Sequence, residues 1–286
     1  MIDRKEKAGV LPVQIKRFSK GLISGQPDLL AMEEPLEIRI RNKGSESDVE
    51  IPFLVTMRTP GNDFELVAGL LFSERIIKSY SEIISIRYCE NPRTDEEKNN
   101  IIIVMLAPEE RSITTVPRNV FMNSSCGVCG KASIEDLKLG LPLPELNASY
   151  KISAELVATL PSKLLEAQVN FRNTGGIHAC GLFDLDGNLQ FSREDIGRHN
   201  ALDKLIGAAL QSGIVPVSEL ILVLSGRASF ELLQKAATAR IFLVIAIGAP
   251  SSLALQVAEA FNITLIGFTK DQSFNVYSGF GRIALP

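Results

Sequence analysis

The sequence predicts an α/β protein: a mixed, largely parallel sheet in the second half of the chain, plus a β-rich N-terminal subdomain. Short, wholly apolar segments alternate with helical patterns in the second half, and strand-type alternation dominates the first 120 residues. A Pro- and Gly-containing segment at 140–144 separates the two parts. Strands that are apolar on both faces and joined by helices are typical of parallel sheets.

The N-terminal elements follow from alternation and turn residues. Segments 36–42 and 49–58 alternate, and the polar residues between them predict a hairpin. Asn62 or Asp63 is a suitable N-cap for a helix that runs to about residue 74. Further strands are expected at 83–88 and 101–106.

The second half begins with a predicted hairpin, in which segments 179–183 and 189–192 flank the turn signal Asp186-Gly187. A helix is predicted over 200–211, where apolar residues recur at helical spacing. The later strands are expected at 221–224, 241–247 and 264–268, with helices at 229–240 and 252–261. We therefore divide the chain into a β-rich subdomain (1–122), a reactive loop and linker (123–145) and an α/β cofactor-binding domain (146–286).

Composition limits the possible functions. The chain has 286 residues, 45% hydrophobic and 22% charged, which is typical of a folded globular protein. Its net charge of −3 argues against a general nucleic-acid binder. No signal peptide or membrane-length apolar run is evident, so we expect a cytoplasmic protein without membrane contact. Thiols stay reduced there, and a C-x-x-C pattern indicates metal binding or catalysis.

Cys126 and Cys129 form such a pattern, in a turn fenced by glycines and followed by Lys131. The lysine charge and the start of a helical run after it would lower the thiol pKa and favour the reactive thiolate. Four interpretations remain open: a zinc site, a thioredoxin-like disulfide cycle, a persulfide or thiol nucleophile, and an inert role. Cys89 and Cys180 lie in or beside apolar runs and are expected to be inert.

Polar groups follow the expected parallel strands, and ligands bind beyond the carboxyl ends of such strands. Arg193, Arg198 and Lys204 could hold phosphates, although structural salt bridges explain them equally well. His178, after two glycines, is either a ligand contact or a hydrogen-bonded core residue. The candidate cofactor-binding residues are His178, Arg198, Arg227, Ser229, Phe268, Thr269, Lys270, Asp271, Gln272 and Ser273.

Several segments together resemble the formate dehydrogenase accessory sulfurtransferase (FdhD/NarQ) family. They include the C-G-x-C-G turn at 126–130, the T-G-G-x-H segment at 174–178, R-E-D-I-G-R-H-N at 193–200, S-G-R-A-S at 225–229 and F-N-V-Y at 274–277. One departure from the family pattern is 72–77, where an acidic-Gly pair is expected before the isoleucines.

The resemblance implies a cytidine-deaminase-like three-layer core and a homodimer. It implies a sulfur carrier that takes persulfide sulfur from a cysteine desulfurase and passes it to the Mo-bis(molybdopterin guanine dinucleotide) cofactor, for the formate dehydrogenase catalytic subunit. By the same resemblance Cys126 carries the persulfide and residues 268–273 bind the cofactor. We expect Cys129 to act as a helper or secondary carrier, and no metal to be permanently bound. Two alternatives stay open: a zinc-dependent deaminase-like hydrolase, and a non-catalytic molybdenum cofactor chaperone.

Overall fold

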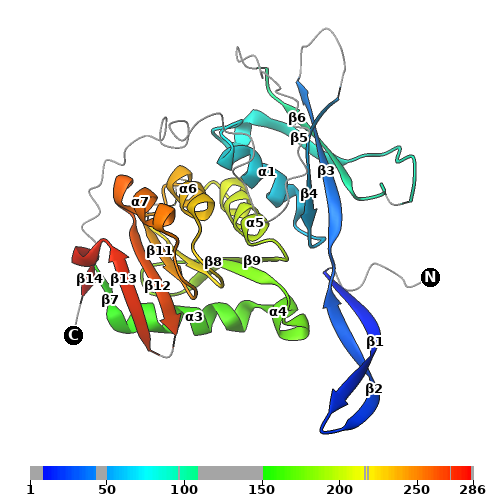
Figure 1. The fold of residues 1–286 in the computed structure, drawn as a ribbon. Helices are drawn as coiled ribbons and strands as arrows, with labels where there is room; N and C mark the ends of the chain where they lie inside the picture. Colours follow the sequence, from blue (N-terminus) through cyan, green and yellow to red (C-terminus); the bar gives the residue numbers. More distant parts are fainter. Residues whose placement is uncertain are drawn as a thin grey trace.

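The centre of the molecule is a six-stranded sheet (Figure 1). The computed structural model describes residues 9–42, 50–95, 97–108, 151–215, 217, 219–270 and 272–284. The sheet order is β13-β12-β11-β10-β8-β9. Its strands are β8 (His178–Phe183), β9 (Leu189–Asp195), β10 (Ile221–Leu224), β11 (Leu243–Ala246), β12 (Thr264–Lys270) and β13 (Ser273–Ser278).

The pairing in this sheet corrects one expectation. The α/β class and the mixed sheet are confirmed, but the sheet is not largely parallel. Only β10–β11 and β11–β12 pair in parallel, whereas β12–β13, β10–β8 and β8–β9 are antiparallel. Tight turns join β8 to β9 and β12 to β13, and a short turn can only connect antiparallel neighbours. Helices make the crossovers between the three central strands.

Helices cover both faces of the sheet. On one face lie α5 (Arg198–Gln211), α6 (Phe230–Thr238) and α7 (Ser252–Ala260), and on the other lie α3 (Ala154–Ala167) and α4 (Val169–Thr174) (Figure 1). The buried residues of β10 divide between them: Leu222 and Leu224 join the core under α5 to α7, while Ile221 and Val223 join the core under α3. Beside α3, the short strands β7 (Ile152–Ser153) and β14 (Ile283–Ala284) pair in parallel.

A second sheet, of order β4-β3-β6-β5, lies beyond helix α1 (Asp63–Ser73) (Figure 1). Its strands are β3 (Glu34–Asn42), β4 (Ile51–Arg58), β5 (Ile83–Tyr88) and β6 (Ile101–Leu106), and a 3-10 turn at Tyr80–Glu82 precedes β5. A second 3-10 turn, Phe280–Arg282, lies between β13 and β14 near the C-terminus. One hydrophobic core joins this sheet, α1 and the α5 side of the central sheet. The proposed boundaries at 122 and 145 fall outside the described residues and stay a prediction.

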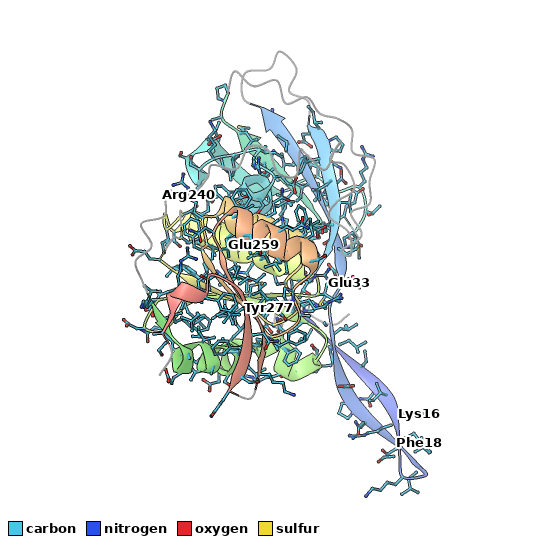
Figure 2. The ribbon with its side chains drawn as sticks, turned by 60° about the vertical axis from the view of Figure 1, so that its left-hand side comes forward. Lys16, Phe18, Glu33, Arg240, Glu259 and Tyr277 are labelled. Atoms are coloured by element: carbon cyan, nitrogen blue, oxygen red, sulfur yellow. The ribbon has the colours of Figure 1, made fainter. Side chains whose placement is uncertain are left out.

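A two-stranded hairpin, β1 (Val10–Ser19) and β2 (Leu22–Ala31), projects from the body (Figure 1). Figure 2 shows Lys16 and Phe18 far along it, with Glu33 near its base. Phe18, Leu22 and Ile23 are exposed.

The sequence located most of these elements. The β3–β4 hairpin, α1, β5, β6 and the alternating strands and helices of the second half are confirmed. It gave no specific prediction for β1, β2 or α3. Helix α3 contains Pro161, whose missing N–H and ring disfavour a helix interior, so its pattern was easily missed. The sequence pattern does not predict strand β13 (Ser273–Ser278).

Two glycines allow α1 and α5 to touch backbone to backbone. A Cβ added to Gly69 would lie 1.8 Å from the backbone oxygen of Asp203, and one added to Gly207 would lie 1.9 Å from that of Glu65. These distances are far below van der Waals contact, so only glycine permits this helix pair.

We expect Gly207→Ala to destabilise the protein by about 3 kcal/mol or more, because the added methyl group forces the two helices apart. Gly25→Ala is the matched control, since nothing lies within 4 Å of its added Cβ. Urea unfolding of both variants measures the difference. Equal stabilities would show that the helix contact is not tight.

Candidate functional site

A cavity of about 1170 Å³ lies at the edge of the central sheet where the parallel strands end. Ser225 follows β10, Ile247 follows β11, and Thr269 and Lys270 end β12; His178 begins the adjacent antiparallel strand β8. The opposite wall comes from α3, α4 and the residues around them. The sequence predicts a ligand site at this edge, because ligands of such sheets bind beyond the carboxyl ends of the strands; the structure has a cavity there.

His178 lies in the cavity wall, close against Gly226. A Cβ on Gly226 would lie 3.2 Å from Nδ1 of His178, so the glycine leaves room for the imidazole. Burial lowers the pKa of His178, and the nearby positive charges of Arg198 and His199 lower it further. The negative charge of Asp195, which pairs with His178 in the β8–β9 register, raises this pKa. The imidazole is therefore neutral at physiological pH and can offer one donor and one acceptor.

The end of β12 is bent by a bulge. The β12–β13 register shifts between Gly267 and Lys270, and Phe268 has a φ of 53°, which is rare for a bulky residue. The shift leaves Phe268 exposed and buries Thr269 in the cavity wall. Bulges are frequent next to functional sites, where they redirect a side chain.

Polar atoms without partners gather around this edge. In the ranges that the structure describes, three buried side-chain nitrogen or oxygen atoms lack a hydrogen bond: Nε2 of Gln168, Nε of Arg198 and Oγ1 of Thr269. Gln168 and Thr269 line the cavity, and Arg198 acts electrostatically on His178. Because buried polar groups are almost always hydrogen-bonded, this concentration indicates a site whose groups are completed by a ligand.

A buried ion pair fixes the end of β9 next to this site. Nζ of Lys204 lies 2.7 Å from Oδ2 of Asp195, and both side chains are almost fully buried. The ammonium also donates to the backbone oxygen of Thr59, and the Thr59 N–H donates to Asp195. Burial raises the pKa of Asp195, while Lys204 and the N–H donors act against it. The network thereby joins the segment before α1 to the strand beside His178.

A second polar link comes from Asn200, which donates to the backbone oxygen of Met57 and to Oδ1 of Asp195. Ile196 N–H donates to the hydroxyl of Thr59. The turn from β9 into α5, which carries Arg198 and His199, is thus held by the N-terminal sheet. Nε2 of His199 lies 2.5 Å from Oε2 of Glu231 and 3.4 Å from Oγ of Ser229.

The structure sorts the predicted cofactor residues into two groups. His178, Thr269, Lys270 and Gln272 line the cavity. Five others are absent from its wall: Arg198, Arg227, Ser229, Phe268 and Ser273. Arg198 and Arg227 nevertheless act electrostatically on His178, and Ser229 lies beside His199. Asp271 lies outside the described residues.

Two of the three proposed phosphate ligands prove to be structural. Arg193 forms an ion pair with Glu65 of α1, with Nε and Oε2 2.5 Å apart. Lys204 is enclosed by Asp195 and backbone oxygens. Both cations are therefore paired with groups of the protein itself, and Arg198 remains the candidate phosphate ligand from residues 193–204.

Of the four cysteines, the structure describes Cys89 and Cys180. Cys126 and Cys129 lie outside the described residues, so their expected role stays a prediction. Cys180 is buried, and burial raises the pKa of its thiol, as expected for an inert core residue. Cys89 is half-buried.

The described residues contain no group of three or more His, Cys, Asp or Glu side chains that could hold a metal ion. Among their helices, none combines the length and the apolar character needed to cross a membrane.

Sequence reasoning missed the α3–α4 wall of the cavity. Glu155, Thr159, Ser162 and Gln168 line it. The rule that ligands bind beyond the carboxyl ends of strands does not point to these residues, because they lie in or directly after a helix that covers the face of the sheet. The amphipathic pattern of 154–167 was the available signal, and Pro161 obscured it.

Comparison with known proteins decides the family. Residues 31–284 match the model of the FdhD/NarQ family. The chain belongs to the FdhD/NarQ family. Relatives named sulfur carrier protein FdhD include one from Streptomyces coelicolor, 44% identical over 95% of both chains. Another from Sulfurisphaera tokodaii is 38% identical over 90% of this chain and 92% of its own.

A crystal structure described as a formate dehydrogenase accessory protein from Desulfotalea psychrophila is similar to this FdhD/NarQ member, with a TM-score of 0.71. The match covers 96% of this chain and all of that chain, at 23% identity. It shows a shared fold.

Lys204→Met should destabilise the protein by about 3–5 kcal/mol, because it leaves the buried Asp195 carboxylate without its cation. The double variant Asp195→Asn/Lys204→Met should recover part of that loss, since no unpaired charge remains. Chemical denaturation of the two variants measures both. No recovery in the double variant would contradict the ion-pair explanation.

His178 gives a pH dependence of stability. Its folded-state pKa lies below the ordinary value, so the unfolded chain takes up the proton first as the pH falls. The stabilising contribution of the neutral imidazole is full above about pH 6.5 and is lost toward the folded pKa. Between about pH 7 and pH 5.5, His178→Gln should therefore lose less unfolding free energy than the wild type. Denaturation at both pH values tests this, and identical losses would contradict it.

Proposed function

We propose that this protein is a sulfur carrier for formate dehydrogenase. It receives persulfide sulfur from a cysteine desulfurase on Cys126 and passes it to the Mo-bis(molybdopterin guanine dinucleotide) cofactor before the cofactor enters the dehydrogenase. Relatives up to 45% identical over 95% of this chain carry the name sulfur carrier protein. The one observation in the structure that supports the proposal is the large cavity with unsatisfied polar atoms at the sheet edge.

The acceptor fits the residues present. Molybdopterin guanine dinucleotide brings phosphates, two ring systems and many hydrogen-bonding atoms. Lys270 lines the cavity, and Arg198 and Arg227 lie near its His178 side. Cationic side chains suit phosphate oxygens, whereas the neutral donors and aromatic residues of the wall suit rings. A volume of about 1170 Å³ exceeds that of most small-molecule sites, as a dinucleotide requires.

The sulfur chemistry belongs to the cysteine turn. A thiolate on Cys126 attacks the outer sulfur of the desulfurase persulfide; the new S–S bond forms as the donor's S–S bond breaks, and the donor cysteine leaves as a thiolate. One persulfide is consumed on the donor as one forms on Cys126, so this step needs no external oxidant or reductant. The positive charge of Lys131 favours such a thiolate. Cys129 is expected to assist.

Cys126→Ala should abolish sulfur loading. After incubation with a cysteine desulfurase and cysteine, mass spectrometry of the intact wild type should show the added mass of sulfur, and the variant should show none. Formate dehydrogenase matured with the variant should be inactive, because the reactive thiol has gone. Cys180→Ala is the matched control and should load normally, since that thiol is buried and protonated.

Two further measurements separate the alternatives. Full dehydrogenase activity with a Cys126→Ala/Cys129→Ala variant would reject sulfur transfer and favour the cofactor chaperone. Zinc bound in equal amount to the purified protein would favour the deaminase-like hydrolase.

The finer expectations also remain proposals: a cytidine-deaminase-like core, a cytoplasmic location, and a homodimer that serves the formate dehydrogenase catalytic subunit. The hairpin β1–β2 supports association, because an isolated two-stranded hairpin with exposed apolar residues such as Phe18, Leu22 and Ile23 is poorly stable alone. Light scattering that gave the mass of a single chain would contradict the homodimer.

A further inference from the structure

The hairpin β1–β2 extends from the body as a long, narrow ribbon (Figures 1 and 2). Each of its strands has ten residues, and within the described part of the chain no third strand pairs with them. A ribbon of two strands is marginally stable in water unless another surface covers it. A partner is therefore expected on one of its faces or along one of its edges.

The turn at the tip fixes which residues share a face. Lys20 and Gly21 have φ values of 48° and 82°, as in the type I′ turn of a two-residue hairpin. The register then runs to the base without a shift, and cross-strand partners lie on the same face. One face, which we call the leucine face, carries five cross-strand pairs. From base to tip they are Leu11 with Leu30, Val13 with Asp28, Ile15 with Gln26, Arg17 with Ser24, and Ser19 with Leu22.

Prolines close both edges of the ribbon to a further strand. The N–H of Met32 donates to the backbone oxygen of Gly9, so the pair just before the ribbon is a hydrogen-bonded one. Hydrogen-bonded and non-hydrogen-bonded pairs alternate along an antiparallel ladder, which puts Pro12 and Pro27 at non-hydrogen-bonded pairs. Their nitrogens therefore face outward, one on each edge, where an added strand would need an N–H. A partner consequently binds a face of the ribbon.

The leucine face is the one that is open from base to tip. At its base Leu11 and Leu30 are 44% and 50% exposed. On the opposite face the pair at the base is covered by the body, since Val10 is buried and Ala31 is half-buried. A partner that covers the whole length of the ribbon therefore lies on the leucine face.

The order of residues along the leucine face matches the same face turned end for end. A two-fold axis through the middle pair brings the first pair of one copy against the fifth of the other, and the second against the fourth. Leu30 then lies against Leu22 of the other copy, and Ile15 lies against its own counterpart. Apolar contacts are thus made at both ends and in the middle of the face.

Charge completes the match between the two copies. The fourth pair of one copy carries Arg17, and the second pair of the other carries Asp28. Both side chains are exposed. Packed sheets lie about 10 Å apart, a gap that an arginine and an aspartate side chain span together. The two-fold axis makes this contact twice.

We propose that two copies of this chain associate through their leucine faces, ribbon against ribbon and tip to base, with Arg17 of each copy paired with Asp28 of the other. This deepens the proposed homodimer and rests on it. A face that complements itself fits a second copy, because only a two-fold interface places the same surface patch on both partners.

Charge reversal tests this interface by sedimentation of the full chain over a series of concentrations. Arg17→Glu and Asp28→Lys each turn two attractive contacts into two repulsive ones, so each should raise the dimer dissociation constant at least about 10-fold. An equal mixture of the two variants should recover most of the wild-type affinity, because every contact in the mixed dimer joins opposite charges. The double variant Arg17→Glu/Asp28→Lys should recover it as well.

The controls separate this contact from folding and from net charge. Lys16→Glu makes the same change of charge on the opposite face and should leave the dissociation constant unchanged. Leu30→Ser removes an exposed apolar side chain from the leucine face and should raise the constant about 10-fold or more. Recovery on mixing cannot come from chains that fail to fold. Equal effects of Lys16→Glu and Arg17→Glu would overturn the inference.

Failure of the proposed homodimer would look different. A wild type that sediments as a single chain would reject the homodimer and this inference together. A wild-type dimer that keeps its dissociation constant in both single variants would reject the leucine-face contact alone. Weakening in both variants without recovery on mixing would reject it too. Sulfur loading of Cys126 is measured independently by mass spectrometry.

Discussion

The structure depends on the buried contact between Lys204 and Asp195. Asp195 ends the edge strand that pairs with the strand of His178, and Lys204 belongs to the helix that covers the sheet. Both groups also bond to the backbone of Thr59, in the segment between the N-terminal sheet and α1. Two charges without water are stable only when each is fully paired. The N-terminal half therefore completes the environment of residues that lie at the cavity edge in the other half.

The helix pair α1–α5 supports the same connection through packing. Gly69 and Gly207 bring the two backbones into direct contact, and the core on that side runs without a break from the second sheet to the central sheet. A buried ion pair between Lys235 and Asp203, joined by the hydroxyl of Ser73, closes the far side of this contact. The elements that carry the site are thus joined to the N-terminal half by backbone contact, hydrophobic packing and a buried ion pair.

Gln168 and Thr269 in the cavity wall each keep one buried polar atom without a hydrogen-bond partner among the described residues. Cationic side chains lie near His178, at Arg198 and Arg227, and in the cavity wall at Lys270 of β12, and two aromatic side chains, Phe171 and Phe274, line the same cavity. Such a lining suits a ligand with an anionic part and a ring part. The nucleotide-bearing molybdenum cofactor that we propose as the acceptor has both.

The sequence alone determined the α/β class, most strands and helices of the second half, and the sheet edge at which the cavity lies. Those features depend on local periodicity and on which residues follow each strand. Only the tertiary structure decided that Arg193 forms an ion pair with Glu65 and Lys204 with Asp195. It also decided that Gln168 and Thr269 line the same cavity. The pairing of charges and the position of a buried carboxamide depend on residues far apart in the chain, and sequence spacing does not show which of them meet.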